Sequence, residues 1–152
     1  MLIAQPKPLQ QLLNTYNSET IHYVSVTQAR MWHLQDKAIF IDARELDEFQ
    51  TSHIPQAIPI GFSKFKKNTY QLPPEKNQLL IVYCTLGIRS ETIAEKIKKL
   101  GYTKVYNLYG GIVGWKNKSY PILNQEKAPT EKVHTRSKYW SQWLKKGHAI
   151  YD

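Results

Sequence analysis

One stretch decides the fold: Leu79-Leu80-Ile81-Val82-Tyr83-Cys84-Thr85-Leu86-Gly87-Ile88-Arg89-Ser90. Its first half is a short, continuous apolar run, which is typical of a strand buried on both faces of a parallel sheet. Residues 91–100 follow with apolar side chains along one helical face, and Gly101 stands where a helix would stop. The stretch therefore predicts a buried strand that turns directly into a helix, an arrangement of α/β proteins.

The turn between this strand and this helix carries Cys84, the only cysteine of the chain. Unpaired backbone N–H groups and the positive end of the helix dipole meet at such a turn. A thiol placed there is expected to shift toward the thiolate, which is the form that attacks electrophiles. A lone cysteine is more often a small buried hydrophobe. The setting, together with the nearby cation of Arg89, favours a nucleophile in an anion-binding loop.

Strands and helices are expected to alternate on both sides of this loop. The strands have β-branched and aromatic residues, and Thr27 suits the N-cap of a helix over 28–34. Alternation of this kind predicts a parallel sheet that is covered on both faces. The further strands are expected at Ile21–Val26, Ala38–Ile41 and Lys104–Leu108, and a last helical segment carries Trp115.

Three segments together resemble the rhodanese family of sulfurtransferases, in the family's order and spacing over residues 21–121. The first two resemble its active-site loop and its Asp-x-Arg … Glu-Phe … Gly-His-Ile-Pro-Gly-Ala signature, and the third resembles its Gly-Gly … Trp signature. The segments are Cys84–Ser90; Ile39–Arg44 with Glu48-Phe49 and His53–Ile60; and Val105–Ile112 with Gly114-Trp115.

The resemblance implies a three-layer α/β/α fold with a central, mostly parallel sheet of about five strands. It also implies a sulfurtransferase of the thiosulfate sulfurtransferase type, in which Cys84 attacks a sulfane donor and carries the sulfur as a persulfide. The acceptor would be a thiol, cyanide or another protein, and no metal or organic cofactor is required. The implied donor-binding residues are Thr85, Leu86, Gly87, Ile88, Arg89 and Ser90, and the implied supporting residues are Asp42 and Arg44.

The segment around His53 departs from the family pattern. Ser52 stands where glycine is usual before the histidine, and Gln56 stands where glycine follows the proline. If the family glycines adopt positive φ, these replacements are expected to cost backbone strain, which affects the path of the loop and not the fold. His53 itself is expected to be a hydrogen-bonded loop histidine and not a general base.

The resemblance divides the chain into three parts. Residues 1–20 are expected to form an N-terminal extension and residues 21–123 the rhodanese-like domain. Residues 124–152 form an aromatic and basic C-terminal extension, in which a helix is expected from an N-cap at Ser137 to a stop at Gly147. Packing on the surface of the domain and contact with a partner or a membrane surface both remain open for Trp140 and Trp143.

Two other classes of function compete with sulfur transfer. Cysteine-based phosphatases and arsenate reductases use a longer loop between cysteine and arginine, and apolar Leu86 and Ile88 make a poor rim for a phosphate ester. A noncatalytic or sulfur-relay module could use the same scaffold to bind a protein. The presence of both Cys84 and Arg89 argues against an inactive relative.

The net charge of +9 favours small anionic donors such as thiosulfate. The lysines are spread over many segments, and no nucleic-acid-binding motif accompanies them, so no specific nucleic-acid site is expected. No apolar run reaches the length of a membrane span, and a single cysteine excludes an internal disulfide. A cytoplasmic protein is the expectation, with an exported form whose signal has been removed as the alternative, and the oligomeric state is left open.

Overall fold

The computed structural model describes residues 8–152. Its centre is a five-stranded sheet in the order β1-β5-β4-β2-β3, in which every neighbouring pair is parallel. The α/β class and the central parallel sheet are therefore confirmed. The strands are β1 (Tyr23–Val24), β2 (Ile39–Asp42), β3 (Ile58–Pro59), β4 (Leu79–Tyr83) and β5 (Lys104–Leu108).

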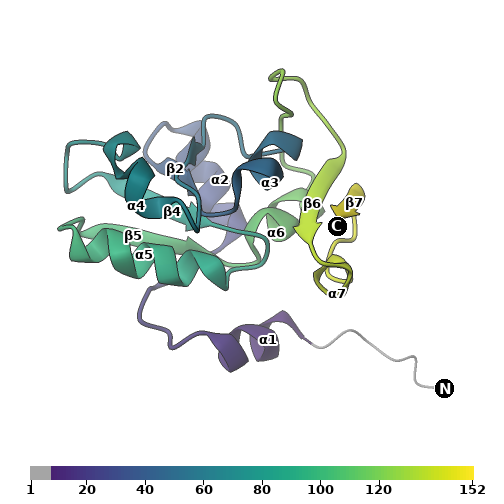
Figure 1. Ribbon diagram of the computed structural model, residues 1–152, viewed down its shortest axis with the longest axis horizontal. Coiled ribbons are helices and arrows are strands. Elements are labelled where there is room, and N and C mark those ends of the chain that lie inside the picture. The colour runs from purple at the N-terminus through teal and green to yellow at the C-terminus, as the bar shows by residue number, and fades with distance from the viewer. Residues whose placement is uncertain (1–7) are drawn as a thin grey trace.

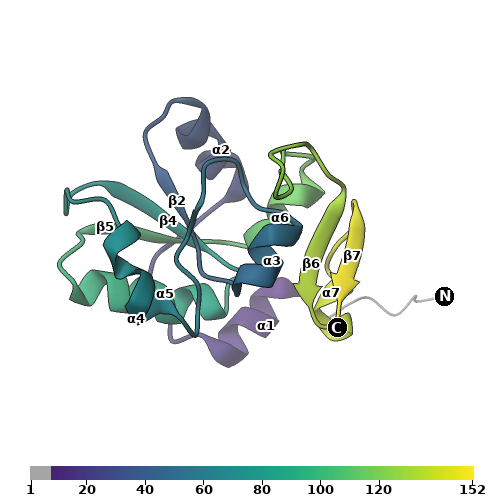
Figure 2. The ribbon, with the colours of Figure 1, turned by 45° about the horizontal axis from the view of Figure 1, so that its top comes forward.

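The sheet lies between two layers of helices. This cover suits β4, which is apolar at every position and therefore needs to be buried on both faces. Alternate side chains of a strand point to opposite faces, so Leu80 and Val82 pack toward α5, whereas Ile81 and Tyr83 pack toward α2 and α6. Figure 2 shows α2 on one side of the sheet and α4 and α5 on the other. The helices are α1 (Leu9–Tyr16), α2 (Val26–Leu34), α3 (Leu46–Thr51), α4 (Phe65–Asn68), α5 (Arg89–Lys99), α6 (Gly111–Asn117) and α7 (Lys138–Ser141), with a 3₁₀ turn at Thr69–Gln71.

The first strand is shorter than the predicted Ile21–Val26, and the helix after it begins earlier. Ser25, not Thr27, is the N-cap of α2, and its Oγ accepts a hydrogen bond from the backbone N–H of Gln28 at 3.1 Å. Both residue types are good N-caps. The predicted N-cap at Thr27 is therefore wrong by two residues, because the β-branched Val26 lies in the first turn of the helix.

The C-terminal extension differs most from expectation. Ser137 is the predicted N-cap, but α7 is only 4 residues long. The chain then passes Gly147, at φ +87°, into β7 (His148–Tyr151), which pairs in parallel with β6 (Lys132–Arg136). Tertiary contacts replace the helix, because Asn117 Oδ1 accepts from the N–H of Lys145 at 2.7 Å. The small β6–β7 sheet lies beside the domain near α3 and α6 (Figure 1).

Gln56 and Ser52 were expected to strain the loop before β3, and the outcome differs between them. Gln56 has a φ of +70°, the left-handed region that favours glycine. Ser52 has a φ of −167°, which is extended backbone that any residue adopts. The strain is therefore confined to Gln56. Among the described residues, no helix has the length and apolar character that crossing a bilayer requires.

Candidate active site

The loop from Cys84 to Ile88 connects β4 to α5 at the carboxyl edge of the sheet. Two backbone hydrogen bonds from α6 fix it, because Ile112 N donates to the carbonyl oxygen of Cys84 at 3.0 Å and Val113 N donates to that of Thr85 at 3.2 Å. A Cβ atom on Gly111 would collide with both of these carbonyl oxygens. The glycine is therefore what lets α6 approach the loop so closely.

The Cys84 sulfur lies inside this loop. Its Sγ atom accepts hydrogen bonds from the backbone N–H of Gly87 at 3.3 Å and of Ser90 at 3.4 Å. The Ser90 hydroxyl lies 3.3 Å from Sγ. Two of the backbone N–H groups at the turn are thus directed at the sulfur. Cys84 is 0% exposed, so the sulfur is enclosed in this conformation.

Arg89 does not point at the sulfur. Its Nη1 and Nη2 atoms donate to the two carboxylate oxygens of Glu48, each at 2.8 Å, and Nη2 also donates to Thr85 Oγ1 at 3.0 Å. Burial raises the pKa of Glu48, but the hydrogen bonds and charge of Arg89 outweigh burial and hold that pKa below its usual value. Arg89 therefore ties the loop to α3 as part of a bidentate ion pair.

Asp42 and Arg44 form a second, fully buried ion pair at the end of β2. Arg44 Nη2 donates to Asp42 Oδ2 at 2.7 Å and to the carbonyl oxygen of Ser52 at 2.7 Å. The Tyr83 hydroxyl also donates to Asp42 Oδ2, at 2.7 Å, and burial followed by the Asp42 charge raises the pKa of Tyr83. The pair thus holds Tyr83, the residue before Cys84, and the end of α3, and its hydrogen bonds do not involve the sulfur.

Three features of the site escaped sequence reasoning. The first is Glu48, which the sequence places in a family signature without showing that it is the ion-pair partner of Arg89. Asn107 is a fully buried polar side chain on β5, and it lies next to the loop. A polar residue at an inward position of a strand is a signal that could have found it. The third feature is the packing of both extensions against the loop.

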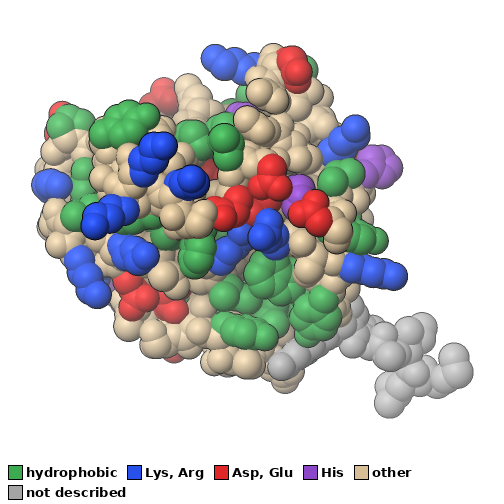
Figure 3. Space-filling view, in the orientation of Figure 1, with side chains coloured by type: hydrophobic (Ala, Val, Ile, Leu, Met, Phe, Trp, Pro, Cys, Tyr) green, Lys and Arg blue, Asp and Glu red, His purple; other side chains and the backbone are tan. Residues whose placement is uncertain are grey.

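The outer side chains of the loop are covered by the two extensions. Leu86 is 1% exposed and belongs to an apolar cluster with Leu12 of α1, Val113 of α6 and Trp143. Trp140 lies over the Arg89 guanidinium, 5.7 Å from its carbon to the ring centre. In Figure 3 hydrophobic side chains gather between α5 and α7, directly below a group of acidic and basic side chains.

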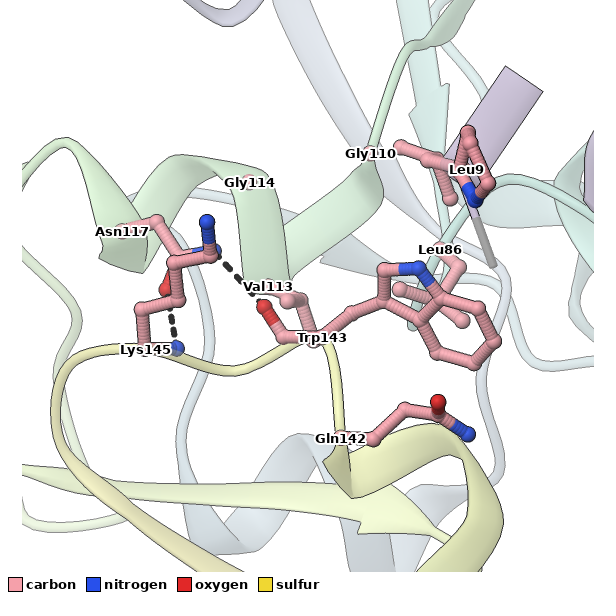
Figure 4. A pocket seen from close by; sticks show the side chains of 10 residues that line it. Leu9, Leu86, Gly110, Val113, Gly114, Asn117, Gln142, Trp143 and Lys145 are labelled. Atoms are coloured by element: carbon pink, nitrogen blue, oxygen red, sulfur yellow. Dashed lines mark hydrogen bonds between the residues drawn. The ribbon is translucent and has the colours of Figure 1, made fainter. Parts of the chain in front are cut away.

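A cavity of about 310 Å³ lies on the outer side of the loop. Leu9, Leu86, Val113 and Trp143 form apolar parts of its wall, and Figure 4 shows the Trp143 indole lying next to Leu86. Cys84 is not among its lining residues. The cavity therefore borders the loop without reaching the sulfur.

One group of side chains has the composition of a metal site. Ligand atoms of Asp47, His134 and Asp152 lie within 4.8 Å of one another. However, His134 Nδ1 accepts the backbone N–H of Arg136 at 3.1 Å, which leaves the ring hydrogen of a neutral imidazole on Nε2. The Nε2 atom that carries this hydrogen lies 3.7 Å from Asp152 Oδ1. The donor set therefore fits a contact between histidine and carboxylate and does not fit a metal ligand.

The fold and the loop together define the class of protein. Residues 27–118 match the family model of the Rhodanese-like domain, and the chain belongs to this family. The central parallel sheet, the loop at its carboxyl edge and the Gly-Gly turn beside the loop are the structural counterparts of the three sequence signatures.

Similar proteins carry more than one name. Thiosulfate sulfurtransferase GlpE of Coxiella burnetii is 29% identical over 96 residues, which are 62% of this chain and 88% of that protein. The tRNA uridine(34) hydroxylase of Buchnera aphidicola is 35% identical over 111 residues, 68% of this chain and 36% of that protein. A thiosulfate sulfurtransferase from Pseudomonas aeruginosa shares the fold, with a TM-score of 0.66, 20% identity and coverage of 89% of this chain and 26% of that chain.

Proposed function

We propose that this protein is a sulfurtransferase that carries a sulfane sulfur as a persulfide on Cys84. The observation that supports this most strongly is the position of Sγ inside a loop at the carboxyl edge of a parallel sheet, with the N–H groups of Gly87 and Ser90 directed at it. Backbone N–H groups stabilise negative charge on sulfur without any cofactor. The relative named as a thiosulfate sulfurtransferase, of which this chain covers most of the length, supports the same chemistry.

The proposed reaction has two half-reactions. When the loop opens to admit thiosulfate, the Cys84 thiol loses its proton to solvent, and the thiolate attacks the outer sulfur of the donor. A bond forms between Sγ and that sulfur, the S–S bond of thiosulfate breaks, and its electron pair leaves with sulfite. Cyanide or a thiolate then attacks the terminal sulfur, the S–S bond of the persulfide breaks, and its electron pair regenerates the Cys84 thiolate. Cyanide leaves as thiocyanate, and a thiolate leaves as a persulfide.

The other residues of the site receive supporting roles in this proposal. Residues 85–90 shape the pocket for the donor, and Arg89 maintains the loop through Glu48 instead of binding the anion itself. Asp42 and Arg44 hold the scaffold behind β4. The family domain is proposed to span residues 21–123. The parts of the flanking extensions described by the structure, 8–20 and 124–152, cover one side of its loop.

The enclosed sulfur favours a second candidate, a sulfur-relay or binding module that opens only on a protein partner. Cys84 is 0% exposed, and both extensions pack against the loop that holds it. A protein acceptor that displaced this cover would gain access to the sulfur, whereas free cyanide would react slowly. Phosphatase chemistry receives no such support, because both Nη atoms of Arg89 are engaged by Glu48 and are not directed at an oxyanion.

The proposed partners are a small anionic sulfur donor and a thiol, cyanide or protein acceptor. The charge of +9 suits an anionic donor. A free thiol that must remain reduced suits the cytoplasm, which is the compartment that we propose.

Steady-state kinetics with thiosulfate and cyanide test the proposal. Thiocyanate formation is expected to follow a ping-pong pattern and to be lost in Cys84→Ala. Persulfide formation without thiocyanate, with transfer only to a protein thiol, would establish the relay module instead. Hydrolysis of a phosphate ester that depends on Cys84 would contradict both.

A further inference from the structure

Ser90 and Asn107 form a chain of hydrogen bonds that ends at the Cys84 sulfur. The Ser90 hydroxyl lies 3.3 Å from Sγ and 2.6 Å from Asn107 Oδ1. The other end of the same amide, Asn107 Nδ2, donates to the carbonyl oxygen of Gly87 at 3.0 Å. Cys84, Ser90 and Asn107 are all 0% exposed, so solvent does not compete for these bonds.

The direction of each hydrogen follows from chemistry. The carbonyl oxygen of Gly87 can only accept, so Asn107 must present its NH₂ group to it and its amide oxygen to Ser90. That amide oxygen also can only accept, so Ser90 has given its single hydrogen to Asn107. The Ser90 oxygen therefore presents a lone pair to the sulfur. The hydrogen bond between the two side chains must then come from the Cys84 thiol, whose S–H group donates to the Ser90 oxygen.

We propose that Asn107 is a positioning residue that keeps the Ser90 hydrogen away from Cys84, and thereby favours the thiol and the persulfide over the free thiolate. A thiolate would face the Ser90 lone pair, or it would take the hydroxyl hydrogen and leave the buried Asn107 oxygen unpaired. In the persulfide the negative charge lies on the outer sulfur and not on Sγ, so the Ser90 lone pair faces an uncharged atom and the bond from Ser90 to Asn107 is kept.

The consequence for the site is that a thiolate at Sγ receives hydrogen bonds from the backbone N–H groups of Gly87 and Ser90 but none from the Ser90 hydroxyl. Asn107 thereby limits the stabilisation of the thiolate without abolishing it, whereas the persulfide, once formed, is not penalised. This role in the reaction rests on the proposed function. The direction of the hydrogens rests on the geometry alone.

Charged residues on the elements that pack around the loop are Arg89 and Glu91 on α5, Asp42 and Arg44 at the end of β2, and Glu48 on α3. The variants used to test Asn107 leave all of these groups unchanged.

Alkylation of Cys84 by iodoacetamide in the full chain, followed over a range of pH, tests the inference. Asn107→Leu frees the Ser90 hydroxyl for the thiolate, and we expect alkylation near neutral pH to be roughly tenfold faster, the effect of one hydrogen bond to a charged group. Its pH profile is expected to move to lower pH. Asn17→Leu is the matched control, because Asn17 Nδ2 also donates to the Gly87 carbonyl, at 2.9 Å, but does not contact Ser90. This control is expected to react like the wild type.

A double-mutant cycle separates positioning from a general loosening of the loop. In a Ser90→Ala background, Asn107→Leu is expected to cause no further acceleration, because Asn107 acts through Ser90. Equal acceleration in both backgrounds, or none in Asn107→Leu alone, would overturn the inference. If Asn107→Leu does not fold, Asn107→Ala removes the same acceptor without adding a charge, and unchanged alkylation in that variant would overturn the inference equally.

Alkylation requires no sulfur donor, so this outcome is independent of the proposed function. If the wild type takes up no sulfur but the double-mutant cycle gives the expected result, the role of Asn107 stands and sulfur transfer is refuted. If the wild type takes up sulfur but the double-mutant cycle fails, only the role of Asn107 is refuted.

Discussion

Glu48 is the residue whose charge attaches the candidate active-site loop to α3. Its carboxylate is 0% exposed and receives both Nη atoms of Arg89, whose side chain is 12% exposed. Removing one partner of a buried pair leaves an uncompensated charge. We expect Glu48→Gln to lower the free energy of unfolding by about 3 kcal/mol near neutral pH, as measured by urea denaturation. The exposed Glu126→Gln is the control and should change little.

The same pair gives a pH dependence with a defined sign. The pKa of Glu48 is lower in the folded than in the unfolded chain, where 4.5 is the ordinary value. The ion pair therefore contributes its full stability above about pH 4.5 and loses it as the pH falls through the lower folded value. The wild type should lose more stability on acidification than Glu48→Gln. Parallel curves for the two proteins would contradict this assignment.

Gln56 is strained, and glycine should relieve the strain. Its φ of +70° is costly for a residue with a Cβ atom, and its side chain is exposed. Gln56→Gly is expected to raise the free energy of unfolding by about 0.5–1 kcal/mol, because the relief exceeds the entropy that glycine adds to the unfolded chain. Gln125→Gly is the control for that entropy, and an equal gain there would contradict the explanation.

At the residue scale the sequence predicted which residues form the loop but not which residues they hydrogen-bond. Cys84 as the residue after a buried strand and Arg89 at the start of a helix follow from local pattern. The partner of Arg89 comes from α3, and the partner of Ser90 comes from β5. Such pairings depend on how distant segments meet in space, which no local pattern contains.

Among the elements, α6 contacts the loop directly through its backbone. Gly111 lies at φ +57°, and a Cβ atom there would meet the carbonyl oxygens of Thr85 and Cys84. Gly111→Ala is expected to lower the free energy of unfolding by about 2 kcal/mol and to reduce sulfur uptake, because the loop must move. Gly114→Ala in the same helix has nearest neighbours at 3.3 and 3.4 Å and is expected to cost less. Equal losses in thermal denaturation of the two variants would contradict this view of the contact.

The elements that were predicted well are those with strong local signals. The apolar run of β4, the amphipathic face of α5 and the strand at Lys104–Leu108 all lie where expected. The helix expected after Ser137 ends early, because Asn117 binds the backbone at Trp143 and Lys145. The β6–β7 pairing joins segments that have no alternating pattern of their own, so it could not be anticipated.

In the whole molecule, the described segments 8–20 and 124–152 close over one side of the candidate active-site loop. The N–H of Ser18 donates to Glu91 on α5 at 2.9 Å, which ties the segment after α1 to the helix that follows the loop. Trp143 packs against Leu86 from the other end of the chain. The sequence allowed either packing on the domain or contact with a partner for the aromatic tail, and the structure shows the packing.

If this cover limits access to the sulfur, loosening it should expose Cys84. Trp143 is 9% exposed, and Trp143→Ala is expected to cost about 3 kcal/mol of unfolding free energy. We also expect faster alkylation of Cys84 by iodoacetamide. Trp32→Ala is the control, because Trp32 packs in the cluster on the α2 side of the sheet, away from the loop. An equal increase in both variants would indicate general destabilisation and would contradict the cover.

The central claim is that Cys84 accepts a sulfur atom, and intact-protein mass spectrometry tests it most directly. After incubation with thiosulfate or another sulfane donor, the wild-type chain is expected to gain the mass of one sulfur atom, which cyanide removes. Cys84→Ala is expected to gain none. Sulfur uptake that survives in Cys84→Ala, or no uptake by the folded wild type from any sulfane donor, would contradict the account.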